Sequence, residues 1–170
     1  MTIQRTISPV DGSVYVERTL AGTAQIEAAL EDARLAQRLW RSVPVAERAA
    51  ILGRFCEAFE SRRDAIAEEL AWQMGRPIRY APNEVRGTLE RARHMIAIGP
   101  DALADIDVGR KDAFRRFLRR EPLGVVFTVA AWNYPYLIAV NSVVPALMAG
   151  NVVILKHSAQ TPLCAERFEE

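Results

Sequence analysis

The last third of the chain constrains the fold more strongly than any other stretch. Residues 125–130 (Val-Val-Phe-Thr-Val-Ala) are nearly all apolar, which is typical of a strand buried on both faces of a sheet. Pro135 ends that run, the apolar segment Tyr136 to Ala149 is long enough for a helix, and Gly150 suits a left-handed helix end. Residues 151–155 form a second apolar run. This order predicts a βαβ unit with two parallel strands and a right-handed crossover.

A polar residue follows each of the two predicted strands. Asn133 lies in the turn after the first strand, and Lys156 ends the second. Ligands of open parallel sheets bind beyond the carboxyl ends of the strands, so we expect an amide donor and a cation at one shared site. Each residue also has a simpler interpretation, because a turn asparagine often bonds its own backbone and a lysine at a strand end is often only solvated.

The composition indicates a globular protein and excludes several partners. The 170 residues suffice for one domain, half of them are hydrophobic, and the net charge of +1 gives no reason to expect a nucleic acid or an anionic membrane. No apolar run has the length of a membrane span and the N-terminus lacks a secretory stretch, so we expect a cytoplasmic location. Two cysteines are too few for a disulfide framework, and no ligand spacing joins His94 and His157, so no metal site is expected.

The first hundred residues are expected to form a β-hairpin and then helices. Residues 1–22 are interpreted as the hairpin, because Pro9-Val10-Asp11-Gly12 is a turn signal between β-favouring runs. Residues 23–100 are interpreted as helical because their apolar residues recur every three or four positions.

Local signals give the expected helix boundaries. Thr23 is expected to cap a first helix that ends near Arg41. A second helical region runs from Pro44 to Met74 and can break around Ser61–Asp64, and Asn83 is expected to cap a third helix. The arginines of that third helix are expected to face outward or to pair with Glu84 and Glu90 of the same helix.

Residues 101–112 are polar and are interpreted as a surface connection. Residues 113–121 are basic, with arginine and phenylalanine in short alternation, which is typical of an exposed strand or hairpin arm.

A single βαβ unit cannot bury its own faces, so we expect it to share one body with the helices. The expected fold class is α/β, with N-terminal helices and the first βαβ unit of a parallel, doubly wound, Rossmann-like sheet. Such a sheet needs more than two strands, so we expect the native sequence to continue.

The motifs after residue 120 resemble those of the NAD(P)-dependent aldehyde dehydrogenase superfamily. They stand in the order and spacing of that family: Glu121-Pro122-Leu123-Gly124-Val125-Val126, Trp132-Asn133-Tyr134-Pro135, Pro145-Ala146-Leu147, Ala149-Gly150-Asn151, and Lys156 with Gln160-Thr161-Pro162. The hairpin and residues 69–77 are also similar to the beginning of the family. The resemblance therefore covers the whole chain but only the N-terminal part of the family's length. It implies that residues 1–170 are the N-terminal part of an NAD(P)-binding domain, with a cofactor unit at 122–170.

The resemblance also implies roles for individual residues. In this family a cysteine thiolate attacks the aldehyde, hydride passes to the nicotinamide, and a thioester is hydrolysed to the carboxylic acid. The residue that matches Asn133 donates its side-chain amide to the oxyanion, and a preorganised donor of this kind is worth about 10²–10³-fold in rate. The residue that matches Lys156 hydrogen-bonds the adenosine ribose. The matching cofactor positions in the first strand and its turn are Val129, Ala130, Ala131 and Trp132.

The loop after Lys156 bears on the choice between NAD and NADP. Many NAD-preferring members carry a glutamate where this chain has Ala159, and such a carboxylate repels a 2′-phosphate. With Ala159, and with Lys156 and Ser158 nearby, we expect NADP to be tolerated or preferred. The Lys156-His157 pair resembles some succinate-semialdehyde dehydrogenases, so a semialdehyde is one possible substrate among small aldehydes.

Two catalytic residues of the family have no match in this chain. The cysteine nucleophile and the general-base glutamate lie beyond position 170 in the family. Cys56 is expected to be buried and inert in a helix, and Cys164 is expected at a helix start, which can lower its pKa. We therefore expect the 170-residue chain alone to be inactive.

The alternative hypothesis is a non-catalytic, truncated remnant that acts as an interaction or dimerisation module. In the family, the segment that matches residues 113–121 begins an oligomerisation arm. A homo-oligomer is therefore expected under either hypothesis.

Overall fold

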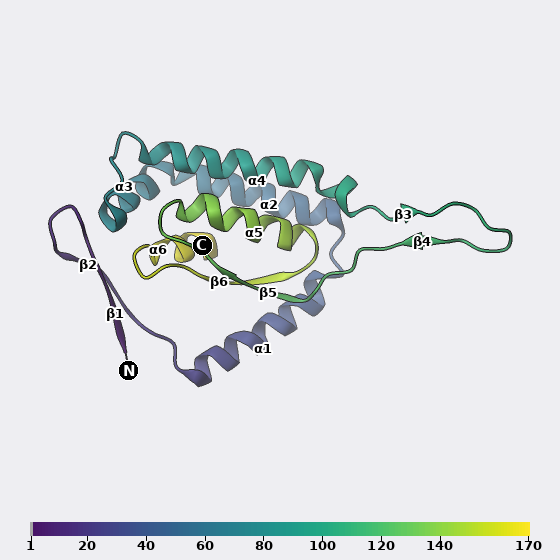
Figure 1. Ribbon diagram of the computed structural model, residues 1–170, viewed down its shortest axis with the longest axis horizontal. Helices are drawn as coiled ribbons and strands as arrows, with labels where there is room; N and C mark the ends of the chain where they lie inside the picture. The colour runs from purple at the N-terminus through teal and green to yellow at the C-terminus, as the bar shows by residue number, and fades with distance from the viewer. Residues whose placement is uncertain (1) are drawn as a thin grey trace.

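A hairpin, a layer of helices and a parallel pair of strands follow one another along the chain (Figure 1). The structure is a computed structural model and describes residues 2–170. The elements are β1 (Ile3–Ile7), β2 (Val14–Thr19), α1 (Thr23–Trp40), α2 (Val45–Ser61), α3 (Arg63–Met74), α4 (Ala81–Leu103), β3 (Ile106–Asp107), β4 (Phe117–Leu118), β5 (Val125–Val129), α5 (Pro135–Met148), β6 (Val152–Lys156) and α6 (Leu163–Glu169).

The N-terminal hairpin forms where the sequence predicts it. β1 and β2 pair antiparallel, with an irregular register between Thr6 and Ile7. Gly12 closes the turn with a φ of +78°, a conformation that costs glycine little because it has no Cβ. The Asp11 side chain accepts a hydrogen bond from the Ser13 amide at 2.9 Å, so the turn also has a local side-chain support.

Two expected helix caps are wrong. Thr23 is the first residue of α1 and Gly22 is its cap, with the Gly22 amide donating to the Gln25 side chain at 2.9 Å. Asn83 lies inside α4, which begins at Ala81. A proline in the first helical turn loses no hydrogen bond, because the amides there have no partner within the helix, and Pro82 therefore allows the earlier start.

The helical region between residues 44 and 75 breaks as expected. α2 ends at Ser61 and α3 begins at Arg63. Gly75 ends α3 with a φ of +74°, and its amide donates to the Ala71 carbonyl at 2.9 Å.

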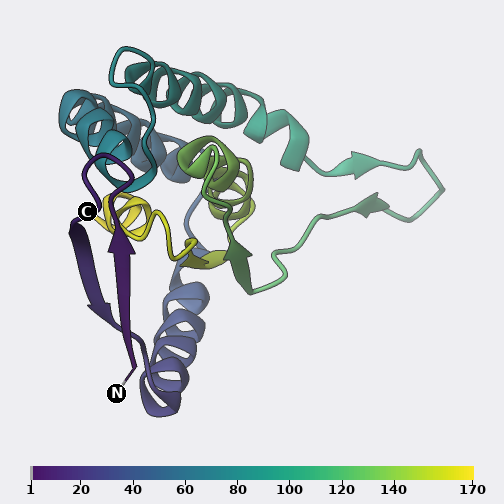
Figure 2. The same ribbon diagram turned by 60° about the vertical axis from the view of Figure 1, so that its left-hand side comes forward.

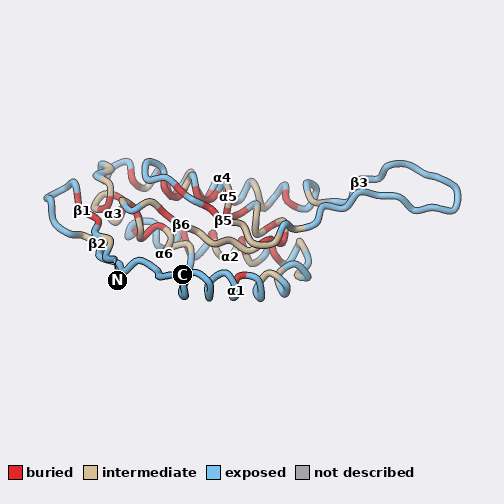
Figure 3. The backbone as a smooth tube through the Cα atoms, turned by 60° about the horizontal axis from the view of Figure 1, so that its bottom comes forward, coloured by how far each residue is buried: buried red, intermediate tan, exposed pale blue. Residues whose placement is uncertain are grey.

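The connection after residue 100 differs from the expected irregular surface segment. α4 continues through Pro100 to Leu103, since a proline in the last turn removes a single backbone hydrogen bond. Beyond it, β3 and β4 pair antiparallel as an arm that extends away from the body (Figures 1 and 2). The arm is exposed along its length (Figure 3), which agrees with the hairpin arm that the basic segment predicts.

The predicted βαβ unit is present, and α5 connects two parallel strands. β5 and β6 pair from Val125 opposite Val152 to Val129 opposite Lys156. Gly150 follows α5 with a φ of +85°, and a Cβ there would displace the Arg48 guanidinium. The positive φ therefore favours glycine at this position.

The expectation that β5 is buried on both faces is wrong in the described chain. Thr128 is buried toward α5, where its hydroxyl lies 2.7 Å from the Ser142 hydroxyl. Phe127 and Val129 point to the opposite face and are 63% and 62% exposed. Alternate residues of a strand face opposite sides, and within residues 2–170 only the α5 side is well covered at this end of β5.

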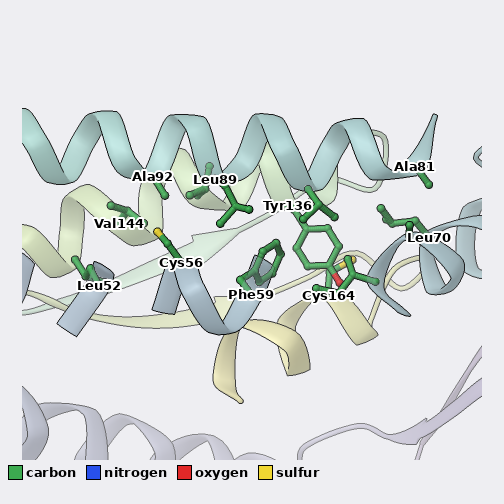
Figure 4. Packing of buried hydrophobic residues seen from close by; sticks show 14 of the residues in the cluster. Leu52, Cys56, Phe59, Leu70, Ala81, Leu89, Ala92, Tyr136, Val144 and Cys164 are labelled. Carbon is green, nitrogen blue, oxygen red and sulfur yellow. The ribbon is translucent and has the colours of Figure 1, made fainter. Parts of the chain in front are cut away.

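The main core lies between α2, α3, α4, α5 and α6 (Figure 4). α5 is apolar around most of its circumference and is packed against α2, α4 and both parallel strands. The Tyr136 ring is fully buried and meets Phe59 edge-on, with 5.2 Å between the ring centroids. None of the helices in the described part of the chain combines the length and the apolar character that crossing a bilayer requires.

Replacing Phe59 by alanine tests this core. Phe59 is 3% exposed and its ring also packs against Phe55 and Phe168, so we expect Phe59→Ala to lower the free energy of unfolding by about 3–5 kcal/mol. Phe114→Ala, at a 65% exposed position of the arm, is the matched control and should change it by less than about 0.5 kcal/mol. Urea unfolding followed by circular dichroism measures both. Equal effects of the two substitutions would contradict the placement of the core.

Candidate functional site

The candidate site lies at the carboxyl ends of β5 and β6. The Ala130 amide donates to the Lys156 carbonyl at 3.0 Å, so the two strands are still joined where they end. The turn of residues 131–134 leaves β5 at this edge, and the loop of residues 157–162 leaves β6 there. The expected common edge for the Asn133 turn and Lys156 is therefore present in the fold.

The turn after β5 presents most of its side chains to solvent. Ala130 is buried, whereas Val129, Ala131 and Asn133 are exposed. Trp132 is 52% exposed and, together with Pro9, Met74 and Gln160, lines an open depression of about 440 Å³. The turn thus offers an amide and an aromatic wall at the sheet edge.

The N-terminal hairpin holds the loop after β6. The Thr6 hydroxyl donates to the Ala159 carbonyl at 2.7 Å, and the Gln160 side chain donates to the Ile7 carbonyl at 3.3 Å. The Lys156 ammonium donates to the His157 carbonyl at 3.1 Å. The Ser158 hydroxyl accepts a hydrogen bond from the Gln160 backbone amide at 3.2 Å. The loop is therefore fixed from outside its own segment, which the sequence did not indicate.

The Asn133 turn is held by an ion pair that sequence reasoning missed. Glu84 was expected to pair with an arginine of its own helix, but its carboxylate is fully buried and paired with Arg76, which lies before that helix. Arg76 also donates to the Asn133 carbonyl at 2.7 Å. Helix spacing could have revealed the error, because Glu84 lies three residues after Ala81 and four before Thr88, both of which are buried on the inner face of α4.

His157 is buried beside the exposed Lys156. Burial and the neighbouring ammonium of Lys156 lower the pKa of His157 to about 4. The imidazole is therefore neutral near pH 7, and neither of its nitrogens has a hydrogen-bond partner within residues 2–170. A neutral histidine in this position contributes no charge to the site.

Neither cysteine has the features of a nucleophile. Cys56 is buried in the core, and burial raises the pKa of its thiol, as expected for an inert residue. The expectation that a helix start lowers the pKa of Cys164 is wrong, because burial raises that pKa well above its ordinary value. In Figure 4, Cys164 lies beside the Tyr136 ring in the core.

The chemistry of the sheet edge favours an anionic ligand with an apolar part. The segment 156–160 offers an ammonium, a hydroxyl and an amide, and it carries no carboxylate. In the described range 2–170, no group of three or more His, Cys, Asp or Glu side chains is arranged to hold a metal ion.

Comparison with known protein families shows to which family the chain belongs. The model of the aldehyde dehydrogenase family matches residues 2–170. The chain belongs to the aldehyde dehydrogenase family. The family's α/β fold, with helices before a parallel pair of strands, is the one predicted from the sequence.

Curated relatives from several bacteria support the assignment to the family. A fluoroacetaldehyde dehydrogenase of Streptantibioticus cattleyicolor is 35% identical over 157 residues, which are 92% of this chain and 31% of that protein. A succinate-semialdehyde dehydrogenase [NADP(+)] of Mycobacterium avium is 34% identical over 165 residues, which are 94% of this chain and 34% of that protein. The chain thus spans about a third of the length of these relatives.

Solved structures of family members superpose on the whole chain. An NAD-dependent benzaldehyde dehydrogenase from Corynebacterium glutamicum matches with a TM-score of 0.89 and 32% identity, over 99% of this chain and 37% of that one. A succinic semialdehyde dehydrogenase from Streptococcus pyogenes, in complex with NADP+, matches with a TM-score of 0.89 and 26% identity, over 98% and 36%. The arrangement of helices and strands is therefore that of the family.

The buried His157 predicts a pH dependence of stability. Its pKa is lower in the folded state than in the unfolded chain, so the unfolded chain binds more protons between about pH 4 and pH 6.5. Stability should fall by up to about 3 kcal/mol as the pH drops through that range. Urea unfolding at several pH values should show a shallower dependence in His157→Asn. His94→Asn, at an exposed position of α4, is the control, and a dependence unchanged by His157→Asn would contradict the prediction.

Proposed function

We propose that this chain supplies the oxyanion donor and the adenosine-binding edge of an NAD(P)-dependent aldehyde dehydrogenase that oxidises an aldehyde to a carboxylic acid. The observation that carries the proposal is the joining of the Asn133 turn and Lys156 at one sheet edge, through the Ala130–Lys156 hydrogen bond. Membership of the family supplies the reaction class. Because the chain spans about a third of its relatives, the complete reaction is a proposal for the whole enzyme.

The donors at this edge fit the adenosine part of a dinucleotide. Lys156 is exposed, and among residues 2–170 its ammonium donates only to the neighbouring His157 carbonyl, so its remaining donors are available for ribose hydroxyls. Val129, Ala130 and Ala131 offer backbone along the path of the cofactor, and Trp132 offers a wall. Bound NAD(P) supplies the hydride acceptor of the reaction.

Asn133 is proposed to stabilise the charge that develops on the substrate. Its exposed side-chain amide donates to the aldehyde oxygen as that oxygen gains negative charge. A donor that is oriented in advance needs no reorganisation during the reaction, which makes it worth about 10²–10³-fold in rate.

The loop of residues 156–159 is proposed to accept NADP. Exposed Ala159 carries no carboxylate to repel a 2′-phosphate, and Lys156 and Ser158 add a cation and a hydroxyl. Relatives named for NADP and for NAD both occur, among them the Mycobacterium avium and Corynebacterium glutamicum enzymes. The balance of charge at this loop favours NADP.

The substrate is proposed to be a small aldehyde, with a semialdehyde as one candidate, which the names of two relatives support. We also propose a homo-oligomer, which the exposed β3–β4 arm supports, because Phe114, Phe117 and Leu118 are open to solvent there.

The alternative function is a dimerisation module without catalysis, which would dimerise through the same arm. The expected cytoplasmic location stays a prediction.

Ala159→Glu tests the proposed cofactor preference. A carboxylate beside the ribose should raise the Kd for NADP about 10-fold or more, through like-charge repulsion, and should leave NAD binding unchanged or tighter. Isothermal titration with each nucleotide measures this. Ala97→Glu, an exposed position on α4, adds the same charge elsewhere as a control. Failure of the unaltered chain to bind either nucleotide would contradict the cofactor assignment.

The isolated chain of residues 1–170 is expected to be inactive. Both of its thiols are buried with raised pKa values, so it has no thiolate to attack an aldehyde. Purified chain mixed with succinate semialdehyde or benzaldehyde and NADP should give no absorbance increase at the wavelength of NADPH. As a further check, the chain is unfolded, alkylated at both cysteines and refolded. Aldehyde-dependent NADPH formation by this alkylated chain would contradict the prediction and would show a reaction that does not depend on a thiol.

A further inference from the structure

A buried ion pair stands at the beginning of α5, directly behind the Asn133 turn. The Glu84 side chain is 0% exposed and the Arg76 side chain 12% exposed, and Arg76 Nη1 pairs with Glu84 Oε2. Glu84 comes from α4 and Arg76 from the segment between α3 and α4. Neither residue belongs to the βαβ unit that it contacts.

Glu84 caps α5 from outside that helix. Its second carboxylate oxygen accepts the Tyr136 amide at 3.0 Å, in the first turn of α5. The residue before α5, Tyr134, makes no side-chain cap of its own. A carboxylate at a helix N-terminus satisfies an amide that has no partner in the helix and interacts favourably with the helix dipole.

Arg76 contacts the turn itself at two points. Its Nη2 donates to the Asn133 carbonyl at 2.7 Å. The guanidinium carbon also lies 4.5 Å from the centre of the Tyr134 ring. The planar guanidinium thus joins a carboxylate, a carbonyl and an aromatic face, an arrangement that the point charge of a lysine cannot reproduce.

The cost of burying this pair indicates that stability alone does not explain it. Burial disfavours the charged form of Glu84 and raises the pKa of its carboxyl, although Arg76 opposes the rise. A buried ion pair is often no more stabilising than an apolar pair of the same volume. Besides the ion pair itself, the contacts described for these two side chains converge on the segment from Asn133 to Tyr136.

We propose that Arg76 and Glu84 are positioning residues that fix the Asn133 turn, so that the Asn133 amide is aimed at one place before a substrate arrives. Arg76 sets the carbonyl side of Asn133, and Glu84 sets the start of α5, where the turn ends. The proposed catalytic use of this arrangement rests on the proposed function of Asn133 as the oxyanion donor.

The test compares the order of the turn in variants that separate the two contacts. Arg76→Gln should lower the backbone order parameter of Asn133 from about 0.85 to below about 0.6, while Tyr136 stays protected. Glu84→Ala should speed hydrogen exchange of the Tyr136 amide about 10- to 100-fold. Glu84→Gln should restore that protection, because its amide oxygen still accepts, and yet leave Asn133 mobile, because Arg76 loses its charged partner.

Arg93→Gln is the matched control for these variants. Like Glu84, Arg93 lies on α4, and it pairs with Glu60 at 2.5 Å, but both side chains are half exposed and their ion pair joins α4 to α2 instead of to the turn. The control should leave both readouts at the values of the unaltered chain. If Glu84→Ala does not fold, Arg76→Gln and Glu84→Gln still test the order of Asn133.

Two results would overturn the proposal. One is an Asn133 order parameter unchanged in both Arg76→Gln and Glu84→Gln. The other is an equal loss of protection at Val140 and Val144, in the middle of α5, which would indicate a general stabilising role. Neither readout needs a bound nucleotide, so a failure of the unaltered chain to bind NADP would count against the proposed function and leave this test standing.

Discussion

The burial of α5 is the constraint on which the rest of the structure depends. This helix is apolar around most of its surface, so most of that surface needs cover, which α2, α4 and the two connected strands provide, while one stripe with Ile138, Asn141 and Pro145 stays exposed. Tyr136 at its beginning and Met148 at its end are both buried. With both ends fixed, the end of β5 and the start of β6 have defined positions, and the strands can pair in parallel register.

The candidate site follows from the same constraint. A parallel pair necessarily brings both carboxyl ends to one edge, and the Ala130–Lys156 hydrogen bond extends the pairing to the edge itself. The two segments that leave this edge are then fixed by other parts of the chain. Arg76 and Glu84 hold the turn after β5, and the hairpin residue Thr6 holds the loop after β6. The helices and hairpin therefore provide a rigid support for residues that lie in irregular backbone.

Predictions from the sequence succeeded for turns and breaks that local forces determine, although the two expected helix caps, Thr23 and Asn83, were placed one and three residues too late. The Pro9–Gly12 turn, the break after Ser61 and the left-handed Gly150 depend on conformational preferences of a few neighbouring residues. Predictions failed where a distant contact decided the outcome. Nothing in the residue type distinguishes Glu84 from a surface glutamate. Its burial results from the packing of α5 and Arg76 against it. Cys164 stands at a helix start, but its pKa follows from the core around it.

The sequence by itself determined the family, the order of the elements and the positions of Asn133 and Lys156 at strand ends, because apolar periodicity and spaced motifs are properties of consecutive residues. The tertiary structure alone decided which charges are buried, that burial raises the pKa of the Cys164 thiol, and which face of β5 stays open. These properties depend on groups brought together from 50 or more positions apart, as Glu84 and the Tyr136 amide are, and the energy of such contacts depends on their distance and their exclusion of water.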